Sequence, residues 1–190
     1  MSAVRTAFVS TDRAPVVVGR EPRPVPVRKE LLELFVLRAE EDSAWVHRCG
    51  PDQVEATLAG VLGECPTLVP DAFPWQVAHQ VSGDRVGAPD VEIGAIVTAA
   101  TLGVATTGSV VLTESAGQDR RSMGLVSDLH VCVLLADQVV TGVPEAIAAL
   151  DPHTPKIWVS GPAARGEIEL KHVEPLEGPQ TLHVVLVHEG

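Results

Sequence analysis

The sequence Ala105-Thr-Thr-Gly-Ser-Val-Val-Leu-Thr113 lies at the centre of the segment that decides the fold, which runs from Ile96 to Leu135. A polar turn leads into one apolar run, and a polar loop separates it from a second apolar run, Val131-Cys-Val-Leu-Leu135. Such runs are typical of strands covered on both faces of a parallel sheet. We therefore expect the turn and the loop to form a hollow at the carboxyl edge of that sheet, where ligands usually bind.

Helical and strand patterns alternate on both sides of this segment. Apolar side chains recur at helical spacing between Arg28 and Ala44, and again between Pro51 and Leu62, where Pro51 suits a first turn. Further elements are expected as short strands at 44–47, 66–69, 156–160 and 181–187 and a helix at 144–150. This alternation predicts an α/β fold, with a mostly parallel sheet flanked by helices.

One segment is less regular. A short helix is predicted near 74–80, in which Trp75 and His79 would share a face, either as packing residues or as part of a pocket wall. The 190 residues suit one domain at 27–190, preceded by an extended arm at 1–26. The arm is predicted from the three prolines in Arg20-Glu-Pro-Arg-Pro-Val-Pro26.

Composition excludes several classes of protein. A net charge of −11 argues against a nucleic-acid surface, and no apolar run approaches the roughly 18 residues of a membrane helix. The three cysteines show no C-x-x-C spacing, and no G-x-G-x-x-G fingerprint occurs, so we expect no metal and no cofactor in this chain. The cysteine usage suits a reducing cytoplasm. The oligomeric state stays open, a homo-oligomer included.

Two sets of residues are candidates for binding a small anion. The turn Thr106, Thr107, Gly108 and Ser109 offers hydroxyls and backbone N–H groups, as does Ser160-Gly161 after a later strand. Arg120 and Arg121 could grip a carboxylate in two places, although surface charge is the alternative interpretation.

Three residues are candidates for catalysis. Glu114 ends the first apolar run, and Glu167 lies in a charged loop beyond a later strand, so either could act as base or nucleophile. His130 precedes the second run, and its imidazole could titrate near neutral pH. Each could equally be a solvated or structural residue.

Several of these motifs together resemble a known family. The segments in order are Val104-Ala-Thr-Thr-Gly-Ser-Val-Val-Leu112, Arg121, Asp128-Leu-His-Val131, Val159-Ser-Gly-Pro162, Glu167-Ile-Glu169 and Gly178-Pro179. Their order and spacing resemble the LUD-domain family, the family of lactate-utilisation protein C. The resemblance implies a NagB/RpiA/CoA-transferase-like fold. It also implies an accessory role in bacterial oxidation of L-lactate to pyruvate, beside partner proteins that carry iron–sulfur clusters.

The resemblance also shows departures. The family usually has an acidic residue at the position of Thr106, an Asp at that of Thr101 and a Ser at that of Ala163. Its Asp-Ile-Glu is Glu167-Ile-Glu169 here, and its His-Gly-Pro is Glu177-Gly-Pro179. Three hypotheses follow: an accessory subunit binding a small carboxylate or phosphate, a stand-alone enzyme of the sugar-phosphate isomerase or acyl-transfer type using Glu114 or Glu167, or a degenerate homologue that only binds a metabolite.

Overall fold

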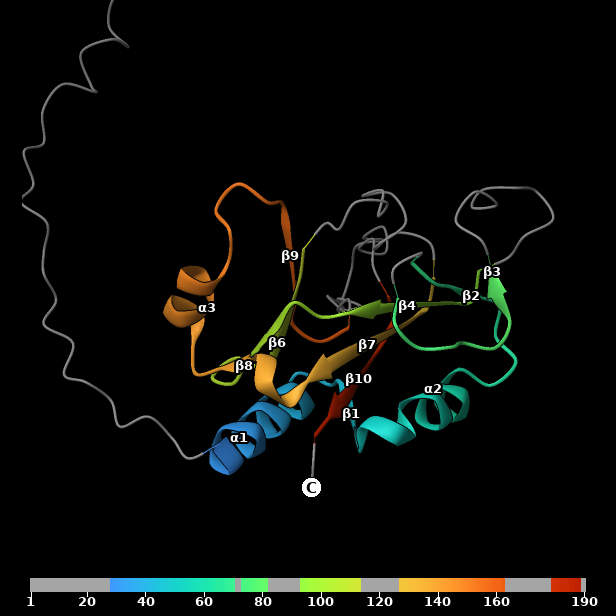
Figure 1. The fold of residues 1–190 in the computed structure, drawn as a ribbon, viewed down its shortest axis with the longest axis horizontal. Helices are drawn as coiled ribbons and strands as arrows, with labels where there is room; N and C mark the ends of the chain where they lie inside the picture. Colours follow the sequence, from blue (N-terminus) through green and yellow to red (C-terminus); the bar gives the residue numbers. More distant parts are fainter. Residues whose placement is uncertain (1–27, 71–72, 82–92, 114–126, 163–178, 189–190) are drawn as a thin grey trace, which may run out of the picture.

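The computed structural model describes residues 28–70, 73–81, 93–113, 127–162 and 179–188. Within these residues the chain forms two β-sheets and three α-helices (Figure 1). The predicted arm at 1–26 lies outside them. No helix in the described segments combines the length and the apolar character needed to cross a membrane.

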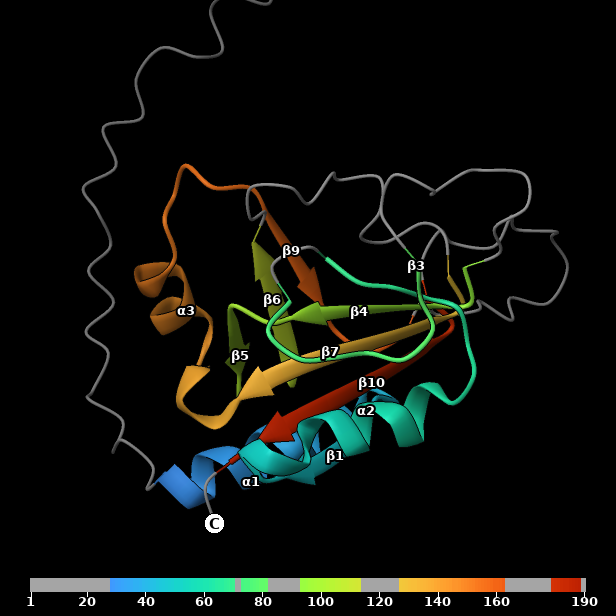
Figure 2. The same cartoon turned by 45° about the vertical axis from the view of Figure 1, so that its right-hand side comes forward.

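The larger sheet has six strands, all parallel to their neighbours. In spatial order they are β1 (Trp45–Cys49), β10 (Thr181–Val187), β7 (Leu129–Leu135), β4 (Ala95–Ala99), β2 (Thr67–Leu68) and β3 (Gln80–Val81). β7 and β10 are the longest and lie side by side in the middle (Figure 2). The predicted α/β fold with a mostly parallel sheet is therefore confirmed.

A second sheet of four strands corrects part of the prediction. Its order is β8 (Val139–Val140), β5 (Leu102–Val104), β6 (Ser109–Thr113) and β9 (Lys156–Val159). β6, the apolar run after the Thr-Gly-Ser turn, is antiparallel to both of its neighbours and does not belong to the parallel sheet. An apolar run indicates burial on both faces, but it does not determine the direction of the neighbouring strands.

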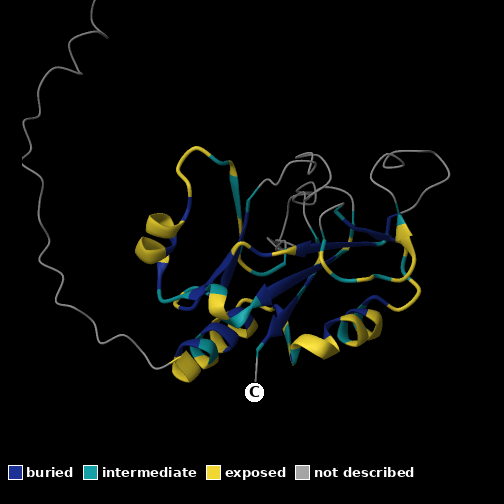
Figure 3. Cartoon of the chain, viewed as in Figure 1, coloured by how far each residue is buried: buried dark blue, intermediate teal, exposed yellow. Residues whose placement is uncertain are grey.

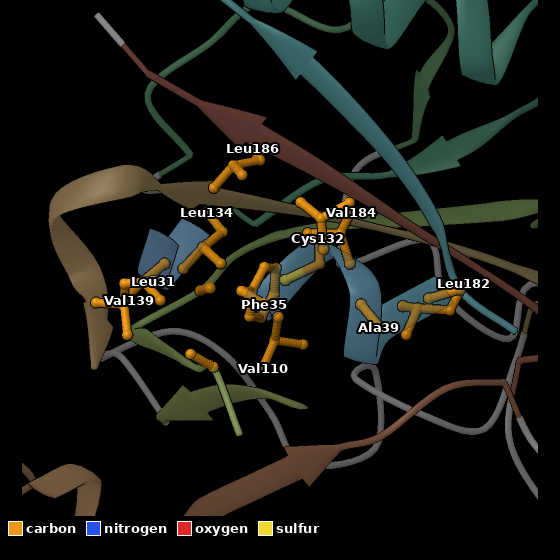
Figure 4. Close-up of a cluster of buried hydrophobic side chains, with 14 of the residues drawn as sticks. Leu31, Phe35, Ala39, Val110, Cys132, Leu134, Val139, Leu182, Val184 and Leu186 are labelled. Carbon is orange, nitrogen blue, oxygen red and sulfur yellow. The ribbon is translucent and has the colours of Figure 1, made fainter. Parts of the chain in front are cut away.

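The helix α1 (Arg28–Glu41) packs between the two sheets. Its Phe35 is fully buried and lies among Leu134 and Cys132 of the parallel sheet and Val110 of the second sheet (Figure 4). The predicted helix is confirmed, although it ends at Glu41 and not at Ala44. The chain leaves the helix through Ser43, which has a φ of 66°.

The remaining helices cover the outer faces. α2 (Val54–Leu62) follows a 3-10 turn at Pro51–Gln53 and buries Val54, Leu58 and Leu62 against the opposite face of the parallel sheet. α3 (Val143–Ala149) covers the outer face of the second sheet with Ala146. In Figure 3 the central strands are mostly dark blue, which marks buried residues, whereas α2 and α3 are mostly yellow, which marks exposed residues.

The helix predicted near 74–80 is absent. Residues 74–79 form bends and turns, His79 has a φ of 54°, and β3 begins at Gln80. Trp75 packs edge-on against Phe73, with ring centroids 5.3 Å apart. Trp75 and His79 are four apart and match a helical face, but a segment of six or seven residues is too short for this spacing to decide between a helix and a turn.

Candidate functional site

Three hydroxyl groups predicted from separate motifs meet in the structure. Ser109 Oγ donates to Thr107 Oγ1 over 2.8 Å, and Ser109 Oγ lies 2.7 Å from Ser160 Oγ. We call Thr107, Ser109 and Ser160 the hydroxyl cluster. The turn before β6 and the residue after β9 come together because β6 and β9 are antiparallel neighbours.

The glycines of the two motifs fix this arrangement. Gly108 has a φ of 64°, and a Cβ placed on it would lie 2.3 Å from the backbone nitrogen of Ala39 in α1. Gly161 has a φ of 70°, and its Cβ would lie 2.2 Å from the carbonyl oxygen of Asp42. Both motifs therefore pack against the last turn of α1, in a conformation that favours glycine and in space that excludes a side chain.

The hydrogen bonds give the cluster a polarity. A hydroxyl carries one proton. Since Ser109 donates its proton to Thr107, it must accept one from Ser160. Among the described residues the proton of Thr107 is then the one left to bond a further acceptor, while Ser160 is exposed and Ser109 is buried. The cluster can thus donate one hydrogen bond to a ligand from an ordered base.

The location of the cluster differs from the prediction. Asp42 and Ala39 lie where α1 ends and the chain turns into the amino end of β1. The cluster is therefore at the amino end of β1, and the expected hollow at the carboxyl edge does not include it. The carbonyl end of a helix carries a partial negative charge, so an anion at this place needs a cationic partner.

Comparison with known proteins decides the family. The LUD domain model matches residues 33–187. The chain belongs to the LUD-domain family. It is 31% identical over 180 residues to a curated protein from Deinococcus radiodurans named "Lactate utilization protein C", with 87% of this chain and 85% of that protein covered. It also resembles the crystal structure of a DUF162 family protein from the same organism, with a TM-score of 0.69 and 24% identity over 86% of this chain and 99% of that chain.

Membership of the LUD-domain family confirms the resemblance seen in the sequence, while the roles of individual residues stay predictions. Thr106, at a position where the family usually has an acidic residue, is exposed and faces Gly142 before α3. Among the described residues no hydrogen bond joins it to the hydroxyl cluster. The structure thus separates Thr106 from the other candidates of its turn.

His130 is a buried, hydrogen-bonded residue of β7. It is 2% exposed, on the second residue of β7, and its Nε2 lies 2.8 Å from Thr98 Oγ1. Burial lowers the pKa of His130 to about 4, so the imidazole is neutral at pH 7. Of the two interpretations of His130, titration near neutral pH and a structural role, the structure favours the structural role, because the side chain lies hydrogen-bonded inside the core.

The four charged candidates, Glu114, Arg120, Arg121 and Glu167, all lie outside the described residues.

Cys132 is fully buried, and burial raises the pKa of its thiol to about 12. Within the described residues no three His, Cys, Asp or Glu side chains approach one another closely enough to hold a metal.

Sequence reasoning missed the contribution of α1. The backbone from Arg38 to Asp42 supplies the surface against which both glycine motifs pack. A signal was present, since each motif places a hydroxyl residue directly beside a glycine, in Thr107-Gly108 and Ser160-Gly161. In this LUD-domain chain the glycine makes the contact with the helix, and its neighbour joins the hydroxyl cluster.

Proposed function

We propose that the protein acts in L-lactate utilisation as an accessory subunit that works beside iron–sulfur partner proteins and binds a small carboxylate or phosphate anion. The observation that carries the role is the 31% identity to a relative named lactate utilization protein C, over 87% of this chain. The match extends over most of both proteins.

Redox chemistry explains why partners belong to this proposal. Oxidation of L-lactate to pyruvate removes two electrons and two protons, and side chains alone cannot take up the electrons. The sequence contains neither a dinucleotide fingerprint nor a C-x-x-C spacing. The electrons would therefore pass to a partner that carries a redox centre, and this chain would bind or position a metabolite.

The hydroxyl cluster could bind an anion only if a positively charged side chain lies beside it. Thr107 has a proton that no acceptor in the described part of the chain takes up, but the end of α1 and Asp42 make the surroundings negative. Arg120 and Arg121 are the arginines that we propose to supply the charge, by gripping the carboxylate or phosphate. Without them the hydroxyls would hold an anion poorly.

A titration tests the ligand proposal. Pyruvate, L-lactate and inorganic phosphate would each be titrated into the full chain in a calorimeter. We expect one of them to bind, and Thr107→Val to weaken that binding by about tenfold, since a hydrogen bond to a charged group is worth about 1.5–3 kcal/mol. Arg120→Ala/Arg121→Ala should abolish it. Thr57→Val, a matched loss of a hydroxyl on α2, should change nothing.

A pull-down tests the partner proposal separately. Tagged protein would be recovered from its native cells, and the iron and acid-labile sulfide that accompany it would be measured. We expect both to copurify. Binding of an anion without any iron-bearing partner would contradict the accessory role and leave the ligand site standing, whereas recovered partners without anion binding would contradict the site alone.

A further inference from the structure

The carboxyl edge of the parallel sheet carries a cleft of about 890 Å³. Three neighbouring strands end at it, with Arg48 at the end of β1, Val187 at that of β10 and Leu135 at that of β7. Figure 2 shows the arrowheads of β7 and β10 beside α1, whose first turn forms one wall of the cleft. The size is that of typical ligand pockets, and the edge is the one where parallel sheets usually bind ligands.

Part of the cleft is apolar. Leu32 of α1 and Leu135 and Leu186 of the sheet line it, and Trp75 adds an aromatic ring. The ring is held by its edge-on contact with Phe73. A ligand that removes these side chains from water would gain roughly 25 cal/mol for each Å² of apolar surface buried.

The lining of the cleft carries more positive than negative side chains, whereas the whole chain has a negative net charge. Its lining includes three cations, Arg28, Lys29 and Arg48, against two carboxylates, Glu33 and Asp137, in a chain of net charge −11. Arg28 and Lys29 form no ion pair within the described residues. The first backbone N–H groups of α1 add a partial positive charge at the same place.

The third cation is already engaged. Both terminal nitrogens of Arg48 donate to the carboxylate of Glu33, over 2.6 and 2.7 Å. This pairing lowers the pKa of Glu33, so the carboxylate is ionised at neutral pH. Glu33 thus occupies the position at which a bound anion would meet Arg48.

We propose that this cleft binds an amphipathic organic anion, with its charged head group at Arg28 and Lys29 and its apolar body against Leu32 and Trp75. The inference goes beyond the proposed function, because the cleft lies at the opposite end of α1 from the hydroxyl cluster. The cleft is lined by the first two turns of α1 and the glycine motifs meet its last turn, so the two regions lie about 15 Å apart along the helix.

The test uses 8-anilinonaphthalene-1-sulfonate, a fluorescent aromatic anion, as probe. The sequence has three tryptophans, and Trp45 and Trp158 are exposed. In full-length Trp45→Phe/Trp158→Phe protein, Trp75 is the sole tryptophan, so energy transfer reports a probe bound within transfer range of Trp75, and the charge variants below place it in the cleft. We expect saturable transfer, which decanoate displaces and inorganic phosphate does not.

Charge variants in this background locate the head group. Arg28→Ala/Lys29→Ala should weaken the probe by about tenfold, from the loss of two charge-assisted contacts. Glu33→Gln should tighten it by about threefold, because it releases Arg48. Arg38→Ala, at the other end of the same helix and paired with Glu41, is the matched control and should have no effect.

Three results would overturn the proposal. The first is that no energy is transferred from Trp75 to the probe. The second is that Arg28→Ala/Lys29→Ala binds the probe with unchanged affinity. The third is that inorganic phosphate displaces the probe as effectively as decanoate does. Far-UV circular dichroism of each variant shows whether it is folded, so that a lost signal is not mistaken for a lost site.

Discussion

His130 is a titratable side chain enclosed in an apolar core. Its neighbours on the same face of β7 are Cys132 and Leu134, both buried, and its hydrogen-bond partner Thr98 is 2% exposed. A charged imidazole there would lose its hydration without gaining an ion pair from any residue that the structure describes. The pKa near 4 therefore connects the folding equilibrium of this protein to pH.

We predict that His130 destabilises the protein as the pH falls below about 6.5. The unfolded chain, with a histidine pKa of 6.5, then binds a proton that the folded chain does not take up until about pH 4. The stability lost over this window is about 3 kcal/mol. Urea unfolding at several pH values between 7 and 4 measures it.

The control variant is His130→Gln, which cannot be protonated and keeps an amide to bond Thr98. Its stability should fall less than that of the wild type between pH 7 and 4, by about 3 kcal/mol. His47 and His183, whose pKa values are also lowered by burial, are present in both proteins and cancel in the difference. Parallel stability curves for the two proteins would contradict this prediction.

At the scale of elements, α1 organises the molecule. Its buried side, with Leu31, Phe35 and Ala39, joins the two sheets, and its last turn receives the two glycine motifs. The hydroxyl cluster therefore depends on how closely the turn before β6 can approach this helix. The approach is set by Gly108, since its missing side chain leaves room for the backbone of Arg38 and Ala39.

We predict that Gly108→Ala destabilises the protein by about 3 kcal/mol, from a left-handed backbone conformation and a backbone clash together. Gly60→Ala is the matched control, because Gly60 lies exposed in α2 with nothing within 4 Å of the new Cβ. It should stabilise by about 0.5–1 kcal/mol. Thermal unfolding compares them, and equal stability of Gly108→Ala and wild type would exclude the close packing on α1.

The same elements show what the sequence could predict. α1, β7 and β10 follow from local periodicity, because apolar spacing directly reflects burial. The pairing of β6 with β9 does not, since it depends on contacts with residues more than 40 positions away, such as that of Thr113 with Lys156. The pairing of β6 with β5 is a local hairpin, whose turn before β6 was recognised but whose first strand was not. The burial of His130 could have been predicted from the sequence. Side chains alternate along a strand, so His130 shares a face of β7 with Cys132 and Leu134, and this face is a better guide to its burial than its position at the start of the run.

The candidate site was predicted in part for a similar reason. Thr107, Ser109 and Ser160 were all candidates, and the structure brings these three together. The sequence could not predict that these hydroxyls lie away from the carboxyl edge of the parallel sheet. Their position depends on β6 belonging to the second sheet, which the apolar run does not reveal. The cleft at that edge is built from Arg28, Arg48 and other residues that lie in no motif, so no sequence pattern marked it.

At the scale of the whole molecule, the layers place two candidate binding regions at opposite ends of one rigid helix. The hydroxyl cluster lies at the last turn of α1, and the cleft lies at its first turn. They share no residue. Between them lies the buried cluster around Phe35, and α1 is the element that both regions contact (Figure 4).

We predict that the two regions bind independently. Thr107→Val should weaken the anion in calorimetry and leave the sulfonate probe unaffected, and Arg28→Ala/Lys29→Ala should do the reverse. Because the free-energy effects of substitutions about 15 Å apart without shared partners add, the combined variant should show a coupling free energy below about 0.5 kcal/mol in each assay. A larger coupling would mean that α1 shifts as a unit when either end is occupied, and that the two regions form one ligand-responsive system.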